Sequence, residues 1–190
     1  MREISLHLMD IAENSVAAEA RNIHIEVHEN LQSDQLTAVI TDDGRGMDEK
    51  TAQQVLDPFY TTRTTRKVGL GIPLLKLAAE MSDGGLSLMT ESGKGARIEA
   101  RFRHSHIDRM PLGDLASTFL ALLVSHPNIH WVFDYETTGK DGNVDNFEFD
   151  DTELKNELGD MPITEPEILK FVRGLIEEGV QATALQTTVY

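Results

Sequence analysis

The fold of this chain is decided by residues 57–75, DPFYTTRTTRKVGLGIPLL. Residues 57–69 show no helical period, whereas the apolar residues of 70–81 recur as they do in an amphipathic helix. Gly69 and Gly71 open this helix, where free backbone N–H groups and the helix dipole favour a phosphate. No GxxxxGK[ST] sequence occurs anywhere, so the segment is not a Walker loop.

Helices and strands are expected on both sides of this segment. Apolar residues spaced three and four apart indicate helices, and strict alternation indicates half-buried strands. Near His104 the composition changes, and DRMPLGD offers a proline–glycine break. These patterns predict helices over 4–20, 48–55, 70–81, 112–125 and 164–179, and strands over 22–29, 36–43, 86–91, 96–102, 130–136 and 147–151.

The charge of the chain is unusual and unevenly distributed. The net charge is −15, and residues 104–190 hold 16 acidic and 5 basic residues, a net −11, against −4 for residues 1–103. Such a surface repels phosphate backbones, so we expect no nucleic acid and no membrane as partners. The absence of cysteine excludes disulfides and thiolate chemistry, and the N-terminus does not resemble a signal peptide, so we expect a cytoplasmic protein.

Four segments resemble, in the family's order, the motifs of the GHKL superfamily, which includes gyrase, heat-shock chaperones, histidine kinases and MutL. They are DIAENS (10–15), DDGRGM (42–47), the 57–75 run and SGKGARIEARF (92–102). Each motif alone is weak, but four in order are specific. The resemblance implies an α/β fold, a two-layer α/β sandwich of the Bergerat ATP-binding type. We expect this domain over 1–103, followed by a small α/β C-terminal domain over 104–190, an acidic accessory unit.

The resemblance also assigns roles around the base and the metal. Asn14 matches the helix position that coordinates Mg²⁺, and Asp42 matches the carboxylate that accepts a hydrogen bond from the adenine amino group. A carboxylate accepts and cannot donate, which favours adenine over guanine. Gly44 and Gly46 match the glycines that let the backbone approach the base.

Asp10 matches the general-base position, because residues four apart share a helix face with Asn14. The family usually has Glu there, and Asp is one methylene shorter, so it reaches less far toward a water. Glu13 is the alternative carboxylate, but it points about 100° away around the helix. A solvated surface carboxylate is the other reading of Asp10.

The phosphates are assigned by the resemblance to the 57–75 run. Backbone groups of the glycine box, Gly69, Leu70 and Gly71, would contact them, and the lid residues Arg66 and Lys67 would close over the γ-phosphate.

These assignments favour an ATP-binding regulatory protein that uses ATP and Mg²⁺. The Asn-bearing helix begins at residue 4, so we expect a stand-alone unit without the phosphoacceptor dimerisation helices of histidine kinases. The preferred hypothesis is a kinase that transfers phosphate to a partner protein, as anti-sigma-factor kinases do. The alternatives are an ATPase switch whose nucleotide state controls partner binding, and a nucleotide-binding module without turnover. The partner and the oligomeric state stay open.

Overall fold

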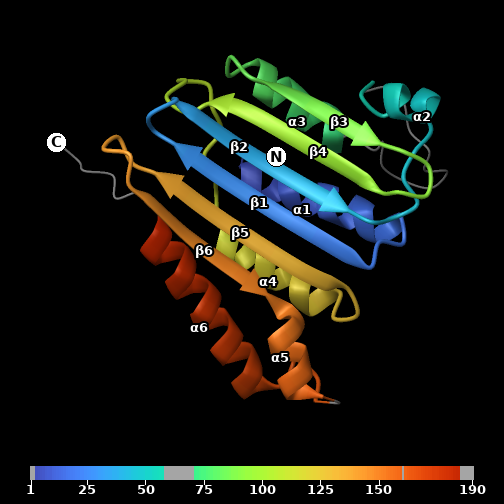
Figure 1. Ribbon diagram of the computed structural model, residues 1–190, viewed down its shortest axis with the longest axis vertical. Coiled ribbons are helices and arrows are strands. Elements are labelled where there is room, and N and C mark those ends of the chain that lie inside the picture. The colour runs from blue at the N-terminus through green and yellow to red at the C-terminus, as the bar shows by residue number, and fades with distance from the viewer. Residues whose placement is uncertain (1–2, 58–70, 160, 185–190) are drawn as a thin grey trace.

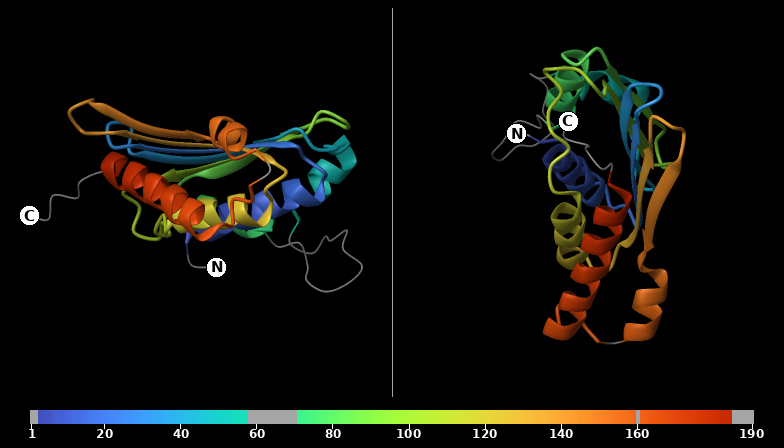
Figure 2. Two further views of the ribbon diagram at one scale, coloured as in Figure 1. Left: turned by 90° about the horizontal axis from the view of Figure 1, so that it is seen from below. Right: turned by 90° about the vertical axis from the view of Figure 1, so that its left-hand side faces the viewer.

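A six-stranded mixed sheet forms one layer of the protein, and helices cover one of its faces (Figures 1 and 2). The computed structural model describes residues 3–57, 71–159 and 161–184. The strand order is β3-β4-β2-β1-β5-β6. The elements are α1 (Ile4–Ala17), β1 (Asn22–Asn30), β2 (Gln35–Asp42), α2 (Glu49–Gln54), α3 (Gly71–Glu80), β3 (Gly85–Thr90), β4 (Ala96–Arg103), α4 (Leu115–Ser125), β5 (His130–Thr138), β6 (Val144–Asp150), α5 (Asp151–Leu158) and α6 (Pro166–Thr183). The α/β class and the layered sandwich predicted from the sequence are confirmed.

Strand β1 joins the two halves of the chain. It pairs antiparallel with β2, in a register that places Ile25 opposite Ile40, and parallel with β5, which places Ile25 opposite Phe133. The predicted accessory unit therefore extends the sheet of the first half. The boundary between 1–103 and 104–190 stays a prediction, and it separates segments that share one sheet.

The core lies between the sheet and the helices. Helix α1 buries Ile4, Leu8 and Ile11, whose spacing of three and four residues keeps them on one face. From the second half, Phe119 of α4 stacks on Phe133 of β5 with ring centroids 4.8 Å apart. Each such side chain contributes roughly 1.5–3 kcal/mol when fully buried. The buried residues of both halves form one hydrophobic cluster.

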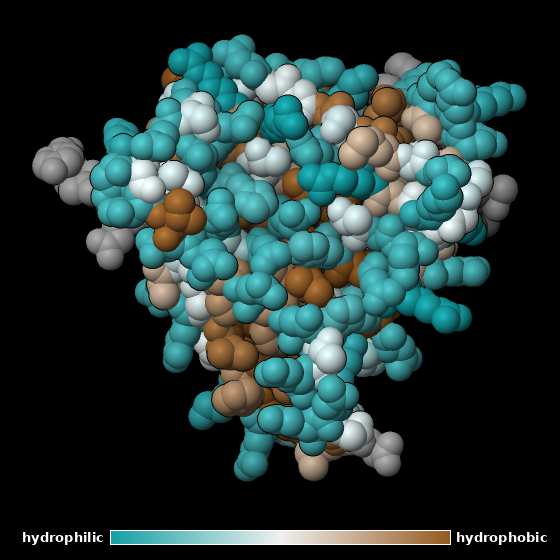
Figure 3. Space-filling view, viewed as in Figure 1, coloured by the Kyte–Doolittle hydropathy of each residue, from teal (hydrophilic) through white to brown (hydrophobic). Residues whose placement is uncertain are grey.

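The other face of the sheet bears no helix layer in the described part of the chain (Figure 2), and mostly hydrophilic side chains cover it (Figure 3). Alternation along β1 buries Ile23, Ile25 and Val27 and leaves His24, Glu26 and His28 on the open face. Neighbouring strands add charged partners there, and the ion pairs are partly exposed, so each stabilises the fold by only about 0–1 kcal/mol.

One helix was not expected from the sequence. Helix α5 follows β6 directly, where we predicted only the end of a strand. Its sequence, DTELKNEL, has only two apolar residues, Leu154 and Leu158, and Asp150 caps it by accepting from the backbone N–H of Thr152 at 2.8 Å. Among the described residues, no helix is both long and apolar enough to cross a membrane.

Candidate functional site

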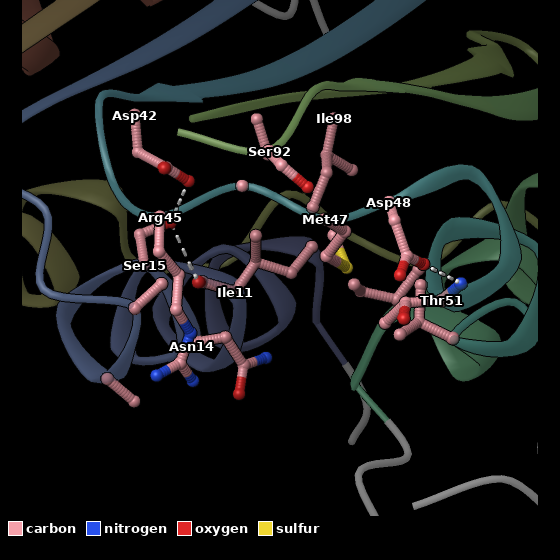
Figure 4. A pocket seen from close by; sticks show the side chains of 16 residues that line it. Ile11, Asn14, Ser15, Asp42, Arg45, Met47, Asp48, Thr51, Ser92 and Ile98 are labelled. Atoms are coloured by element: carbon pink, nitrogen blue, oxygen red, sulfur yellow. Dashed lines mark hydrogen bonds between the residues drawn. The ribbon is translucent and has the colours of Figure 1, made fainter. Parts of the chain in front are cut away.

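A cavity of about 690 Å³ lies between α1 and the loops at one end of the sheet (Figure 4). Helix α1, the turn after β2, helix α2 and the β3–β4 hairpin form its walls. Its lining residues are Ile11, Asn14, Ser15, Ala17, Ala18, Asp42, Arg45, Gly46, Met47, Asp48, Thr51, Val55, Ile72, Ser92, Ala96 and Ile98. The cavity thus combines an apolar wall with a few polar groups, as small-molecule sites do.

Helix α1 presents one face to this cavity. Ile11, Asn14, Ser15 and Ala18 are three, four and seven residues apart, so they lie along one side of the helix. The structure therefore brings the predicted metal ligand Asn14 and the predicted adenine acceptor Asp42 to the same cavity.

The carboxylate of Asp42 is held by a hydrogen bond at each oxygen. The Ser15 hydroxyl donates to Oδ2 at 2.6 Å, and the backbone N–H of Gly44 donates to Oδ1 at 2.9 Å. Each carboxylate oxygen has a second lone pair, so Asp42 keeps acceptor capacity toward the cavity.

The glycines of the turn are required by protein packing. A Cβ at Gly44 would lie 2.8 Å from the carbonyl oxygen of Ala18. Gly46 has φ +60, and a Cβ there would lie 2.0 Å from the carbonyl oxygen of Glu91. Gly46 lines the cavity, whereas Gly44 is buried behind Asp42. Both glycines therefore allow the turn to pack closely against its neighbours, whatever they contribute to a ligand.

The β3–β4 hairpin fixes the same turn from the other side. Thr90 Oγ1 accepts from the backbone N–H of Met47 at 2.9 Å and donates to the carbonyl of Gly95 at 2.8 Å. Gly95 has φ +81, and a Cβ there would lie 1.9 Å from the carbonyl oxygen of Asp42. The backbone N–H of Gly93 donates to the carbonyl of Arg45 at 2.7 Å. The fourth motif, the least specific in sequence, is therefore what closes the turn that carries Asp42.

Asp10 lies where α1 meets the start of α3. It is exposed and does not line the cavity, but a Cβ at Gly71 would lie 2.2 Å from its Oδ2. Gly71 thus leaves room for a carboxylate beside the first turn of α3, where the helix dipole favours negative charge. His7, one turn earlier on α1, is 2 % exposed, and its burial lowers its pKa below the ordinary value.

Glu13, the alternative carboxylate, faces another part of the protein. Its Oε1 pairs with His126 Nε2, at the C-terminal end of α4, at 2.9 Å. It does not line the cavity. Glu13 is therefore engaged with α4, whereas Asp10 lies beside Gly71; the choice of Asp10 as the base stays a prediction.

Four predicted contacts lie outside the described residues: Arg66, Lys67, Gly69 and Leu70. They stay predictions.

Most of the lining residues were not proposed from the sequence, and two of them, Ser15 and Arg45, bring polar groups beside Asn14 and Asp42. Ser15 directly follows Asn14, and its signal was a hydroxyl four residues after Ile11, in line with the buried face of the helix. Arg45 sits in the middle of the DDGRGM motif, and its backbone N–H donates to the carbonyl of Ala18 at 2.9 Å. Its side chain reaches toward the Asn14 side of the cavity (Figure 4). Arg45 thus places one cation at the edge of the cavity.

The cavity fits a magnesium–nucleotide complex by the chemistry of its lining. Asp42 supplies an acceptor for a ring amino group, and Ile72, Ile98 and Met47 supply apolar surface for a flat ring. The amide oxygen of Asn14 is a suitable ligand for Mg²⁺, which prefers oxygen and keeps several waters.

A second group of candidate metal ligands lies at the end of β6. His130, Asp150 and Asp151 place one ligand atom each within 4.8 Å of one another. The buried Asp151 already accepts from the backbone N–H of Trp131 at 3.1 Å and pairs with Lys155 at 2.7 Å. The Lys155 ammonium occupies the place of a cation there, so the group is a structural network that anchors α5.

Comparison with known proteins points to one family. A family model described as "Histidine kinase-, DNA gyrase B-, and HSP90-like ATPase" matches residues 2–106, just over half of the chain. Sensor protein kinase FleS of Pseudomonas aeruginosa is 33% identical over 58 residues, covering 30% of this chain and 14% of that protein. Sporulation kinase C of Bacillus subtilis is 26% identical over 88 residues, which cover 46% of this chain and 20% of that protein. The chain spans less than a quarter of the length of either relative.

One solved structure matches over a longer stretch. The N-terminal domain of a DNA repair protein superposes with a TM-score of 0.52 at 14% identity, covering 77% of this chain and 52% of that chain. This likeness concerns the fold alone. Because it covers more of the chain than residues 2–106, it extends past the family match.

Proposed function

The chain belongs to the histidine kinase-, DNA gyrase B- and HSP90-like ATPase family, and we propose that it binds Mg–ATP in the cavity beside α1 and transfers the γ-phosphate to a partner protein. The family implies an ATP-binding domain. The observation that carries the proposal is that Asn14 and Asp42 line one cavity, with Asp42 already fixed by Ser15 and Gly44.

The chain's own residues have separate roles in this proposal. Asp42 accepts from the adenine amino group and selects against guanine. Asn14 holds the metal through its amide oxygen, and Arg66 and Lys67 are proposed to contact the phosphates. Mg–ATP, when bound, supplies the γ-phosphoryl group and the metal charge that offsets its negative charge. Phosphoryl transfer needs little covalent help from a protein, so positioning and charge supply most of the acceleration.

Asp10 is proposed as the general base. A positioned base contributes roughly 10²–10⁴-fold, and it must reach the proton that it accepts directly or through one water. Asp is shorter than the usual Glu, and Asp10 lies outside the cavity lining. We therefore expect slow hydrolysis of ATP by water. This is tolerable in a kinase whose partner brings a hydroxyl or imidazole group to the site.

The kinase reading is further supported by the names of the relatives, a sensor protein kinase and a sporulation kinase. Those proteins are much longer than this chain. The alternative proposal is an ATPase switch whose nucleotide state changes how the protein binds a partner. It is favoured by the sheet that β1 and β5 share, because this sheet connects the nucleotide cavity to the acidic half.

Release and transfer of labelled γ-phosphate test these proposals. Wild type is compared with Asp10→Asn, Asp10→Glu and Glu13→Gln, each alone and with a cell extract as a source of acceptors. The kinase proposal expects weak release by wild type alone, labelling of a protein in extract, and loss of both in Asp10→Asn. Asp10→Glu should restore some hydrolysis because it reaches further.

Three outcomes contradict parts of the proposal. If Glu13→Gln abolishes turnover and Asp10→Asn does not, Glu13 rather than Asp10 is the general base. If wild type hydrolyses ATP rapidly and labels no protein, the switch replaces the kinase. If wild type binds no ATP, the site itself is misassigned.

A further inference from the structure

A second hollow lies between α5, α6 and the end of β6, and it shares no residue with the nucleotide cavity. We name it the α5–α6 groove. Its volume is about 660 Å³, and it is lined by described residues of those three elements alone. Figure 3 shows hydrophobic atoms low on the viewed face, in the region of these elements, surrounded by hydrophilic residues.

The floor of the groove is apolar. At the base of the groove lies Phe149 of β6, which is 5 % exposed, and at one side of the groove lies Leu154 of α5, which is half-buried. On α6, Phe171 and Leu175 also line it, yet they are 64 % and 44 % exposed. Large apolar side chains that remain this exposed and lie one helical turn apart form a stripe rather than an isolated surface residue.

This stripe is not needed to hold α6 on the protein. The neighbouring residues Val172 and Ile176 are fully buried in the core and already fix the inner face of the helix. Phe171 and Leu175 therefore form a second apolar row beside the packed one. Much of the surface of these two side chains stays exposed in the described part of the chain.

The rim of the groove is acidic. Glu148, Asp150, Glu153 and Glu157 line it, and no lysine or arginine of the described ranges does. This concentrates in one place the negative charge that the sequence shows for residues 104–190. Carboxylates around an apolar floor attract cations and repel anions, including nucleic acid, anionic lipid and a second copy of this chain.

We propose that the α5–α6 groove binds a cationic amphipathic helix of a partner protein. The apolar row of such a helix would pack on Phe171 and Leu175, whose i, i+4 spacing matches the row of an incoming helix. Its lysines or arginines would face the carboxylate rim. This proposal does not depend on the nucleotide cavity or on turnover.

The probe is a fluorescein-labelled designed peptide of about 14 residues, roughly four helical turns, with one leucine stripe and lysine elsewhere. Its controls are the same stripe with glutamate in place of lysine, and a scrambled leucine–lysine peptide without a stripe. Binding to the full chain is measured by fluorescence anisotropy at low and high salt.

Two variants test the groove, and one tests general charge. Phe171→Gln should weaken binding about tenfold, because exposed aromatic anchors carry much of the affinity at such surfaces. The triple variant Glu148→Gln, Glu153→Gln, Glu157→Gln should weaken it about fivefold and reduce its salt dependence. A control with the same change in charge outside the groove, Glu80→Gln, Asp145→Asn, Glu177→Gln, should stay within about twofold of wild type. All these side chains are exposed, and circular dichroism checks that the variants are folded.

The proposal is supported if the striped cationic peptide binds wild type and both groove variants weaken it selectively. It is overturned if the peptide does not bind, if the acidic or scrambled peptide binds equally well, or if the control triple loses as much affinity as the groove triple. It is also overturned if sedimentation shows a dimer that Phe171→Gln dissociates, because a second copy is then the occupant.

Discussion

Replacing Asp42 by asparagine should change nucleotide choice with little effect on the fold. In the native protein the carboxylate accepts from the Ser15 hydroxyl and from the backbone N–H of Gly44. An asparagine side chain is nearly the same size and can turn its carbonyl oxygen toward Gly44. Its amide then faces Ser15, whose hydroxyl can rotate to accept instead of donate. Both internal hydrogen bonds are kept, so we expect a loss of less than about 1 kcal/mol in the free energy of unfolding.

The cost appears when adenine binds. The amino group of the base donates, and the Asp42→Asn variant would present a donor where the native carboxylate presents a second lone pair. A mismatched or unmade hydrogen bond in a partly desolvated site costs about 1–3 kcal/mol. That free energy corresponds to roughly 5- to 150-fold in affinity. Guanine has a carbonyl oxygen where adenine has its amino group, so the same substitution should improve GTP relative to ATP.

Calorimetric titration with Mg–ATP and Mg–GTP measures both effects, and thermal unfolding measures the stability. Ser15→Ala is the matched control: it removes one hydrogen bond that orients Asp42 but leaves the carboxylate as an acceptor. Ser15→Ala should therefore weaken ATP binding less than Asp42→Asn and preserve the preference for ATP. An unchanged ATP affinity in Asp42→Asn, or an ATP to GTP ratio that does not move, would refute the assignment of Asp42 to adenine.

Three further predictions address the metal, the two halves of the chain and pH. Asn14→Ala should weaken Mg–ATP binding about tenfold or more but weaken metal-free ATP little, as titrations with and without EDTA would show; an equal loss in both contradicts a metal role. A fragment of residues 1–106 should unfold or aggregate, because it exposes the edge of β1 that β5 covers, and a soluble ATP-binding fragment would argue against this. Burial lowers the pKa of His7 below its ordinary value of 6.5. Below pH 6.5 the unfolded chain therefore binds a proton at His7 that the native chain does not bind. The free energy of unfolding falls with acidification until the pH reaches the pKa of His7 in the native protein. The free energy of unfolding should therefore fall less in His7→Leu than in wild type when the pH is lowered from about 7.5 to 5.5. The difference between the two losses is ~1.4 kcal/mol for each unit by which burial lowers the pKa of His7. Equal losses in the two proteins would contradict a lowered pKa of His7.

Local patterns predicted most of the helices and strands. The strand expected over 22–29 is β1 (Asn22–Asn30), and the helix expected over 112–125 is α4 (Leu115–Ser125). Both have strong periodicity with a clear apolar face. Helix α5 was missed because its stability comes from the Asp150 cap and from Asp151, which links it to Trp131 and Lys155. Only the contact with Trp131 is tertiary; the cap and the Asp151–Lys155 pair are local, and the two leucines, Leu154 and Leu158, are too few to show an apolar period.

The pairing of strands was harder to predict than the strands themselves. Nothing local in NIHIEVHE or HWVFDYE shows that β1 and β5 lie side by side in parallel. Both alternate apolar and polar residues, which fixes which face of each strand is buried but not which strand is its neighbour. The change in charge near His104 suggested two units, although charge describes the surface and the shared core does not depend on it.

The site was predicted through its motifs, and the supporting contacts were not. Asn14 and Asp42 were proposed because their motifs occur in a recognisable order, and their roles stay predictions. Ser15 was not, because its importance is a hydrogen bond to a residue 27 positions away. The same holds for Gly95, whose close approach to the Asp42 carbonyl becomes visible only in three dimensions.

The parallel ladder between β1 and β5 has a consequence for the protein during its synthesis. Its two strands lie more than one hundred residues apart along the chain, so one side of β1 has no strand to pair with while the middle of the chain is being made. At roughly 5–20 residues per second, a nascent chain waits several seconds for β5 to be synthesised. Closing such a long loop also slows folding after release from the ribosome. The N-terminal motifs that are proposed to bind nucleotide are thus translated early but completed late, which makes the growing polypeptide a candidate client for chaperones until its second half arrives.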